Sequence, residues 1–137
     1  MLRSGLTAWY RCLRLVATYE FRLRVALGPG GDLMLTSRIR NTNTNGKPFS
    51  FTFAYHTRFA VTDICEVRVE GLETLDYLDN LKNKERFTEQ GDAITFESEI
   101  DRVYLRTPTK IAILDHERKR TFVLRKDGLP DAGRNDA

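Results

Sequence analysis

The sequence of 137 residues has few of the features that build metal centres, disulfide frameworks or membrane spans. It contains only two cysteines, Cys12 and Cys65, and two histidines, His56 and His116, and none of them has the spacing of metal ligands. Two distant cysteines do not make a disulfide framework, so we expect a reducing compartment, the cytoplasm. No apolar run approaches the ~20 residues that a membrane helix needs. We therefore expect no metal site and no membrane partner.

The chain also lacks a strong excess of charge of either sign, because its net charge is +3 at pH 7. Lysine and arginine are spread along the sequence and interleaved with aspartate and glutamate. This pattern favours a solvated, mixed surface over a nucleic-acid-binding stripe. A basic β-domain that binds nucleic acid is the alternative, and it requires a cluster of basic residues on one face and strongly salt-dependent binding. The residues concerned are Arg118, Lys119, Arg120, Arg125 and Lys126.

Both ends of the chain differ in composition from the part between them. Residues 1–18 form an atypical N-terminal segment, with three arginines and no acidic residue among the first sixteen. This composition allows either an organellar transit segment or a non-native start. Residues 133–137 are small and polar, and we expect them to form a divergent, frayed tail. The folded domain is expected over residues 19–132.

Apolar residues recur with a period of two along most of the chain, which is typical of β-strands with one buried face. Residues 19–27 and 33–40 alternate in this way around the turn at 28–32, and they predict an antiparallel hairpin. The aromatic segment 49–56 predicts another strand, with phenylalanines on one face and His56 on the other. Further strands are expected over residues 66–71, 94–105, 110–116 and 120–125.

These strands, about seven in number, are separated by short turns, which predicts an all-β, antiparallel sandwich or barrel. Strands do not alternate with helices, so we do not expect a parallel sheet. Residues 72–90 are less regular. Their leucines at positions 75, 78 and 81 have near-helical spacing, which allows one or two helical turns.

The predicted strand 94–105 contains a break in its pattern. Its apolar residues fall at even positions up to Ile100 and at odd positions from Val103 onward. A strand cannot change face without an extra residue or a bend, so the break predicts a β-bulge that re-aims the carboxylate of Asp101. The alternative is an edge strand that leaves one sheet for another, with Asp101 merely exposed.

His56 is the residue best suited to acid–base chemistry. It shares a strand face with Ser50, Thr52 and Ala54, and a face of such small residues is typical of a groove. An imidazole there can donate or accept a proton near neutral pH. The competing interpretation is a histidine that only hydrogen-bonds a neighbouring strand.

Several ordered motifs resemble plant members of the hexose-6-phosphate 1-epimerase family, and together they cover residues 19–132. They are FRLRVALGPGGDL from Phe21, FSFTFAYHT from Phe49, VEGL from Val69, FTE from Phe87, EIDRVY from Glu99 and LRKDGLPDA from Leu124. This resemblance implies a twisted antiparallel β-sandwich of the galactose mutarotase-like group, incomplete relative to the family. One departure is Arg58, where family members usually carry an aromatic residue.

The resemblance also implies an isomerase of carbohydrate metabolism, a glucose-6-phosphate 1-epimerase, that interconverts the α and β anomers of a hexose 6-phosphate. Such an enzyme needs no cofactor, and we expect a monomer without nucleic-acid or membrane partners. By this resemblance, His56 is the acid that protonates the ring oxygen, and Asp101 binds sugar hydroxyls.

Two parts of the family's site are missing from the sequence. The glutamate base is expected well after residues 129–132, but no glutamate follows Glu117. The residues that hold the 6-phosphate are expected mainly from strands before residue 19. Because a missing base lowers the rate by orders of magnitude, we expect this polypeptide alone to be weak or inactive. The alternative is a non-catalytic carbohydrate-binding fragment that lacks the glutamate base.

Overall fold

The structure is a computed structural model that describes residues 6–12 and 18–135, with side chains described from residue 18 to residue 133. Most of the atypical N-terminal segment and the last two residues of the tail lie outside the described residues. The described part contains eleven strands and two short 3-10 helices, and every strand pair is antiparallel. The predicted all-β, antiparallel fold is therefore confirmed. No helix in the described ranges is long and apolar enough to cross a membrane.

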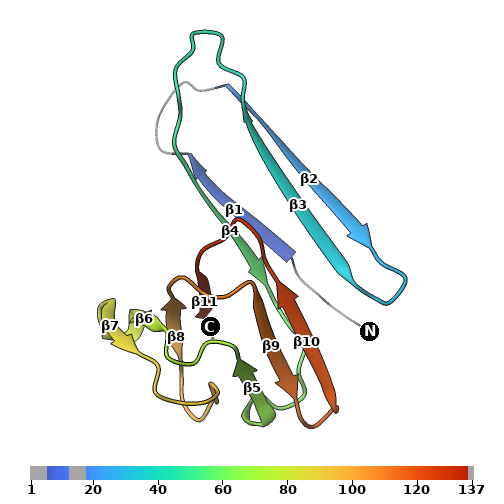
Figure 1. Cartoon of the computed structure of the whole chain (residues 1–137), viewed down its shortest axis with the longest axis vertical. Helices are drawn as coiled ribbons and strands as arrows, with labels where there is room; N and C mark the ends of the chain where they lie inside the picture. The colour runs from blue at the N-terminus through green and yellow to red at the C-terminus, as the bar shows by residue number, and fades with distance from the viewer. Residues whose placement is uncertain (1–5, 13–17, 136–137) are drawn as a thin grey trace. The chain divides into compact units, whose positions relative to one another are not determined.

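The chain divides into two compact units, Met1–Phe59 and Ala60–Ala137. In the first unit, β2 (Tyr19–Leu27) and β3 (Leu33–Asn41) form a long hairpin, as predicted from their alternation (Figure 1). The second strand pair joins β4 (Phe51–Thr57), which was predicted, with β1 (Leu6–Cys12), which was not.

Aromatic side chains connect these two strand pairs of the first unit. The ring centroids of Phe21 on β2 and Phe53 on β4 are 6.1 Å apart. The hydroxyl of Tyr55 on β4 forms a hydrogen bond with the hydroxyl of Ser37 on β3. Because side chains alternate across a strand, the phenylalanine face of β4 packs toward the hairpin and its neighbours in sequence point the other way.

The second unit is built from two sheets. The three-stranded sheet has the order β10–β9–β5, and the four-stranded sheet has the order β11–β8–β6–β7. The first sheet contains β5 (Val67–Glu70), β9 (Lys110–Asp115) and β10 (Arg120–Arg125). The second contains β6 (Asp76–Asp79), β7 (Glu85–Thr88), β8 (Asp101–Tyr104) and β11 (Ala132–Asn135). The 3-10 helices are η1 (Ile64–Glu66) and η2 (Asn80–Lys82).

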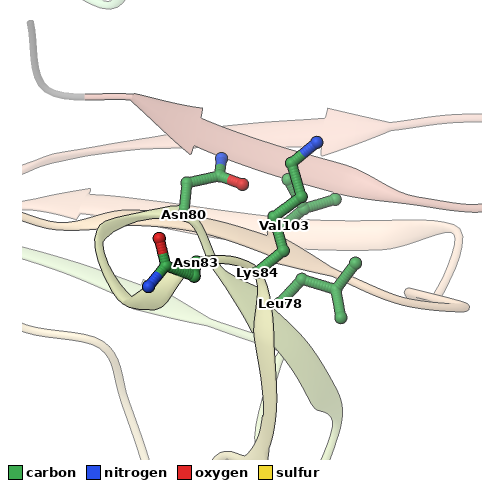
Figure 2. Close-up of a pocket in the computed structure, with 5 residues that line it drawn as sticks. All are labelled: Leu78, Asn80, Asn83, Lys84 and Val103. Atoms are coloured by element: carbon green, nitrogen blue, oxygen red, sulfur yellow. The ribbon is translucent and has the colours of Figure 1, made fainter.

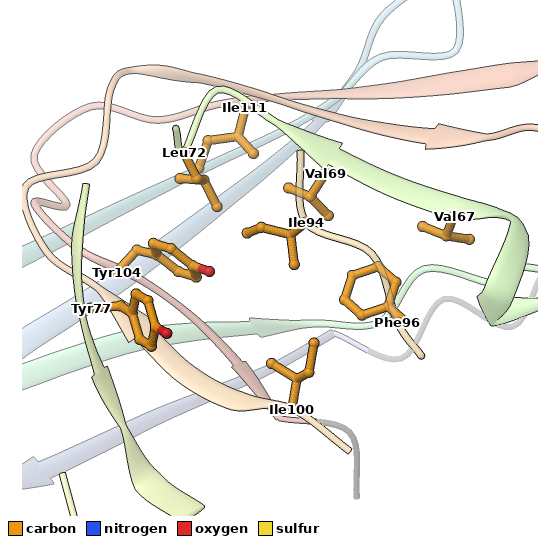
Figure 3. Packing of buried hydrophobic residues seen from close by; sticks show 9 residues of the cluster. All are labelled: Val67, Val69, Leu72, Tyr77, Ile94, Phe96, Ile100, Tyr104 and Ile111. Carbon is orange, nitrogen blue, oxygen red and sulfur yellow. The ribbon is translucent and has the colours of Figure 1, made fainter. Parts of the chain in front are cut away.

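One hydrophobic core joins the two sheets of this unit (Figure 3). Its buried side chains come from β5 and β9 on one side and from β6 and β8 on the other, so the second unit is a small two-layered sandwich. The buried members of this cluster are Val67, Val69, Leu72, Tyr77, Ile94, Phe96, Ile100, Tyr104 and Ile111.

Of the one or two helical turns considered for residues 72–90, the structure has one, the 3-10 turn η2. The rest of this segment was not predicted to be strand, but it forms the hairpin of β6 and β7 on either side of η2. Its leucines do not share a buried face, because Leu78 is half-buried and Leu81 is exposed, while the buried residues of β6 are Tyr77 and Asp79. The near-helical spacing of the leucines was therefore coincidental.

The predicted strand 94–105 is also shorter than expected, because β8 begins only at Asp101. The predicted bulge is wrong, since β8 pairs with β6 and with β11 without an extra residue. The buried face stays at even positions and continues to Tyr104, which is 3% exposed. Before β8, Ile94 pairs with Val69 of the other sheet, so the chain does pass from one sheet to the next, as the alternative interpretation held. The edge position in that interpretation is wrong, because β8 lies between β11 and β6.

The tail does not begin as a frayed segment. Residues 133–135 continue β11 and pair with β8. The expectation of a frayed tail is therefore wrong for these three residues. The composition misled the prediction because backbone hydrogen bonds to a neighbouring strand do not depend on large apolar side chains.

Candidate functional site

His56 lies near the end of β4, with an exposed side chain. Thr52 and Ala54, four and two residues earlier, are exposed on the same face. Phe53 and Tyr55 face the other way, with their rings in an edge-to-face contact at 4.8 Å between centroids. The imidazole therefore lies on the polar face of β4, as the sequence predicted, where a soluble reactant can reach it.

Asp101 is the first residue of β8 and is half-buried rather than merely exposed. Its Oδ1 accepts a hydrogen bond of 2.8 Å from Nδ2 of Asn80, which lies in the turn after β6. Among the described side chains, none donates to the second oxygen, Oδ2. One carboxylate oxygen is thus fixed in position while the other can accept a hydrogen bond from a ligand.

An open hollow of about 720 Å³ lies on the outer face of the four-stranded sheet (Figure 2). Leu78 and Val103, which are paired across β6 and β8, give it an apolar surface. Asn80, Asn83 and Lys84 add two amides and an ammonium group. This size is typical of small-molecule sites, which combine apolar surface with a few polar groups.

Asp101 adjoins this hollow through two of the residues that line it. It is two residues before Val103 on β8, and alternation places the two side chains on the same sheet face. It is also the hydrogen-bond acceptor of Asn80. The carboxylate that the resemblance assigns to sugar hydroxyls is therefore positioned beside a hollow with further polar groups.

The turn between β6 and β7 is held by hydrogen bonds that fix the polar side of the hollow. The buried carboxylate of Asp79 accepts a bond of 3.0 Å from the backbone N–H of Leu81, which caps η2. The carbonyl of Asp79 accepts a second bond, of 2.8 Å, from the backbone N–H of Lys84. Asn83 and Lys84 both have left-handed backbone, with φ of 54° and 63°.

A polar network lies on the opposite face of β8. Oε2 of Glu89 accepts a hydrogen bond of 2.6 Å from the Tyr104 hydroxyl and another of 3.1 Å from Nη1 of Arg102. The Arg102 guanidinium lies over the ring of Tyr77, 4.4 Å from its centroid. These contacts hold β8 from its inner side, which leaves its outer side for the hollow.

The environment of this network shifts two of its pKa values in opposite directions. Burial acts to raise the pKa of Glu89, but the hydrogen bond from Tyr104 and the backbone N–H of Gly91, with the charge of Arg102, outweigh it and lower the pKa. Burial, together with the Glu89 carboxylate, raises the pKa of Tyr104. The network is therefore strongest with Glu89 ionised and Tyr104 protonated.

Three of the basic residues considered for nucleic-acid binding have structural partners instead. Arg118 donates from Nε to the Thr62 hydroxyl, and Arg120 donates from Nε to Asp115 at 2.9 Å. The ammonium group of Lys126 donates to the carbonyls of Thr107 and Leu129, at 2.9 and 2.6 Å. These hydrogen bonds hold loops of the second unit.

Sequence reasoning predicted His56 and Asp101 as site residues, and they belong to the first and second unit respectively. It missed Asn80, Asn83 and Lys84, because the strand pattern carries no information about a turn. The sequence signal that could have indicated these residues is the mostly polar stretch 80–84, which separates two short strands. Arg58, the departure from the family pattern, is exposed directly after β4.

Comparison with known proteins identifies the family. The family described as Aldose 1-epimerase matches residues 16–132, a range that includes both His56 and Asp101. A protein of Cenchrus ciliaris, named "Putative glucose-6-phosphate 1-epimerase", is 78% identical over 115 residues, which are 84% of this chain and 35% of that protein. The chain thus spans about a third of the length of this relative. It follows from the match over most of its length that this chain belongs to the aldose 1-epimerase family.

Proposed function

We propose that this chain forms part of a glucose-6-phosphate 1-epimerase and contributes the histidine acid and a sugar-binding carboxylate. The observation that supports this most strongly is the family match over residues 16–132, which spans both groups. The substrate class follows from the name of the 78% identical relative. The proposed reaction interconverts the α and β anomers of a hexose 6-phosphate.

In the proposed reaction, His56 donates a proton to the ring oxygen while a carboxylate base takes the proton of the anomeric hydroxyl. The bond between C1 and the ring oxygen breaks and leaves an open-chain aldehyde. Rotation of the aldehyde followed by the reverse proton transfers closes the ring as either anomer. The exposure of His56 on the polar face of β4 is compatible with this role, because the acid must reach the substrate.

Asp101 is proposed to bind the hydroxyl groups of the sugar. Asn80 holds Oδ1, so Oδ2 is available to accept a hydrogen bond from a sugar hydroxyl. A hydrogen bond to a charged acceptor contributes about 1.5–3 kcal/mol. The hollow next to Asp101 has the size and the mixed surface that a hexose phosphate requires.

The base is not assigned to any residue of this chain. General acid–base groups contribute roughly 10²–10⁴-fold each to the rate. We therefore propose that the chain alone catalyses exchange weakly, and that an external carboxylate such as acetate can replace part of the function of the base.

The test is the rate of anomer exchange of glucose 6-phosphate, measured by exchange NMR with the purified chain and increasing acetate. We expect exchange above that of the same acetate buffer, lost in His56→Ala and retained in His116→Ala. His116 is a matched control, because it is the other histidine and is also exposed. Equal rates for the chain and the buffer, or equal loss in both variants, would refute His56 as the acid.

A further inference from the structure

The hollow beside Asp101 contains a cation that the proposed reaction does not use. Lys84 lines the hollow, and its side chain extends alongside Val103 (Figure 2). It is exposed and takes part in none of the ion pairs formed by the described side chains. An ammonium group with no carboxylate partner, in a hollow of ligand size, can bind an anion.

The other lysine of the same turn differs in its surroundings. The ammonium group of Lys82 lies over the ring of Phe87, 4.8 Å from the centroid, and Lys82 does not line the hollow. The two lysines are two positions apart and have the same charge. The position of Lys84 in the hollow is therefore a specific property of this residue and not of the turn in general.

The backbone directs Lys84 toward this position. Left-handed conformation at two successive residues other than glycine is uncommon, yet both Asn83 and Lys84 adopt it. The hydrogen bond from the backbone N–H of Lys84 to the carbonyl of Asp79 closes the turn in that form. The lysine side chain thus leaves the backbone from a fixed point beside the hollow.

The charges around the hollow suit a ligand with two chemically different ends. The carboxylate of Asp101 accepts hydrogen bonds from hydroxyl groups and repels phosphate, whereas the ammonium group of Lys84 attracts phosphate. Leu78 and Val103 offer an apolar surface to the C–H groups of a sugar ring. A hexose phosphate satisfies all three, with its hydroxyls toward Asp101 and its phosphate toward Lys84.

We propose that Lys84 binds the phosphate group of a hexose phosphate seated in this hollow and favours phosphorylated over free sugars. The identity of the sugar in this inference rests on the proposed function. The phosphate contact rests on the position of Lys84 in the hollow. Lys84 would contact the phosphate in addition to the basic residues that are expected from strands before residue 19.

The test compares the binding of glucose 6-phosphate and of glucose by the full chain, using NMR titration in the absence of acetate. Lys84→Gln should raise the Kd for glucose 6-phosphate about tenfold, the factor for one lost charge-assisted hydrogen bond. It should leave the Kd for glucose unchanged, and Lys84→Arg should retain most of the affinity for the phosphate. Lys82→Gln is the matched control and should leave both Kd values unchanged.

Three results would overturn the inference: equal effects of Lys84→Gln and Lys82→Gln, an equal loss of affinity for glucose, or no preference of the unmodified chain for the phosphorylated sugar. The binding test does not depend on catalysis. Phosphate-selective binding that depends on Lys84, without exchange that depends on His56, would refute the proposed function and support this inference. Exchange that depends on His56, together with phosphate binding that does not depend on Lys84, would support the proposed function and refute this inference.

Discussion

Replacing Tyr104 with phenylalanine isolates one hydrogen bond in the second unit. The substitution removes the O–H donor that lies 2.6 Å from Oε2 of Glu89 and keeps the buried ring. Glu89 is 13% exposed at its side chain, so water can replace the lost donor only in part. A hydrogen bond to a charged group contributes about 1.5–3 kcal/mol, and we expect a loss near 2 kcal/mol because Arg102 still donates to the same oxygen.

The assay is native-state hydrogen exchange of the backbone amides of β6 and β8, which measures the free energy of opening. A loss of about 2 kcal/mol corresponds to roughly thirty-fold faster exchange through global opening. Tyr77→Phe is the matched control, because the Tyr77 ring stacks on the same core and its hydroxyl donates none of the bonds to Glu89. We expect its opening free energy to change by about 0.5 kcal/mol or less.

A double-mutant cycle with Glu89→Gln tests the reasoning directly. If the hydrogen bond carries the effect, Tyr104→Phe should destabilise the Glu89→Gln background less than the unmodified chain, with a coupling of about 1 kcal/mol. Additive effects of the two substitutions would show that Tyr104 contributes only through its ring, and the argument from the Glu89 hydrogen bond would fail.

Further expectations concern pH and backbone strain. The pKa of Glu89 is lowered in the folded state, so its stabilisation is present above the unfolded value of 4.5 and is lost as the pH falls through the folded value. Glu89→Gln should therefore flatten the fall in unfolding free energy between roughly pH 5 and pH 3, measured by urea denaturation. Burial raises the pKa of Tyr104, so its stabilisation is complete below the unfolded value of 10.0 and declines at higher pH, a decline that Tyr104→Phe should remove. Gly71→Ala places a Cβ at φ +94° and 3.1 Å from the carbonyl oxygen of Lys110, and should cost about 2–3 kcal/mol. Gly128→Ala, at φ +72° in open space, should cost only about 1 kcal/mol, and equal losses would argue against the close approach at Gly71.

The sequence predicted strands best where charged and apolar residues alternate over many positions. β2 and β3 were predicted almost to their ends, because the alternating pattern extends over nine residues in each, although Leu23, Val25 and Leu27 on the apolar face of β2 are exposed. β9 and β10, with six residues each, were also predicted, β9 to within one residue of its end and β10 over its full length. A long alternating pattern therefore predicts both that a segment is a strand and which of its residues share a face.

The short strands of one hairpin were not predicted from the sequence. β6 and β7 have four residues each, too few for a period of two to exclude other patterns. Their turn contains Asn83 and Lys84 in left-handed conformation, where glycine is the usual signal. The hairpin was therefore not recognisable from propensity, and contacts within the core determine it.

The candidate site shows a similar division. His56 followed from its position in an alternating strand, and its exposure was predicted correctly. Asp101 was selected for a bulge that does not exist, although the resemblance to the family pointed to the same residue. Asn80 and Lys84 contact the hollow from a turn, and only the folded chain brings them near Asp101 and Val103.

The passage of the chain between the two sheets of the second unit has a consequence for how that unit unfolds. Ile94 is tied to β5 of one sheet, and seven residues later Asp101 opens a strand of the other sheet. Phe96 and Ile100, between these points, are buried in the shared core. Neither sheet can separate without pulling these side chains into water, so the unit should melt as one cooperative body, with no intermediate that retains a single sheet.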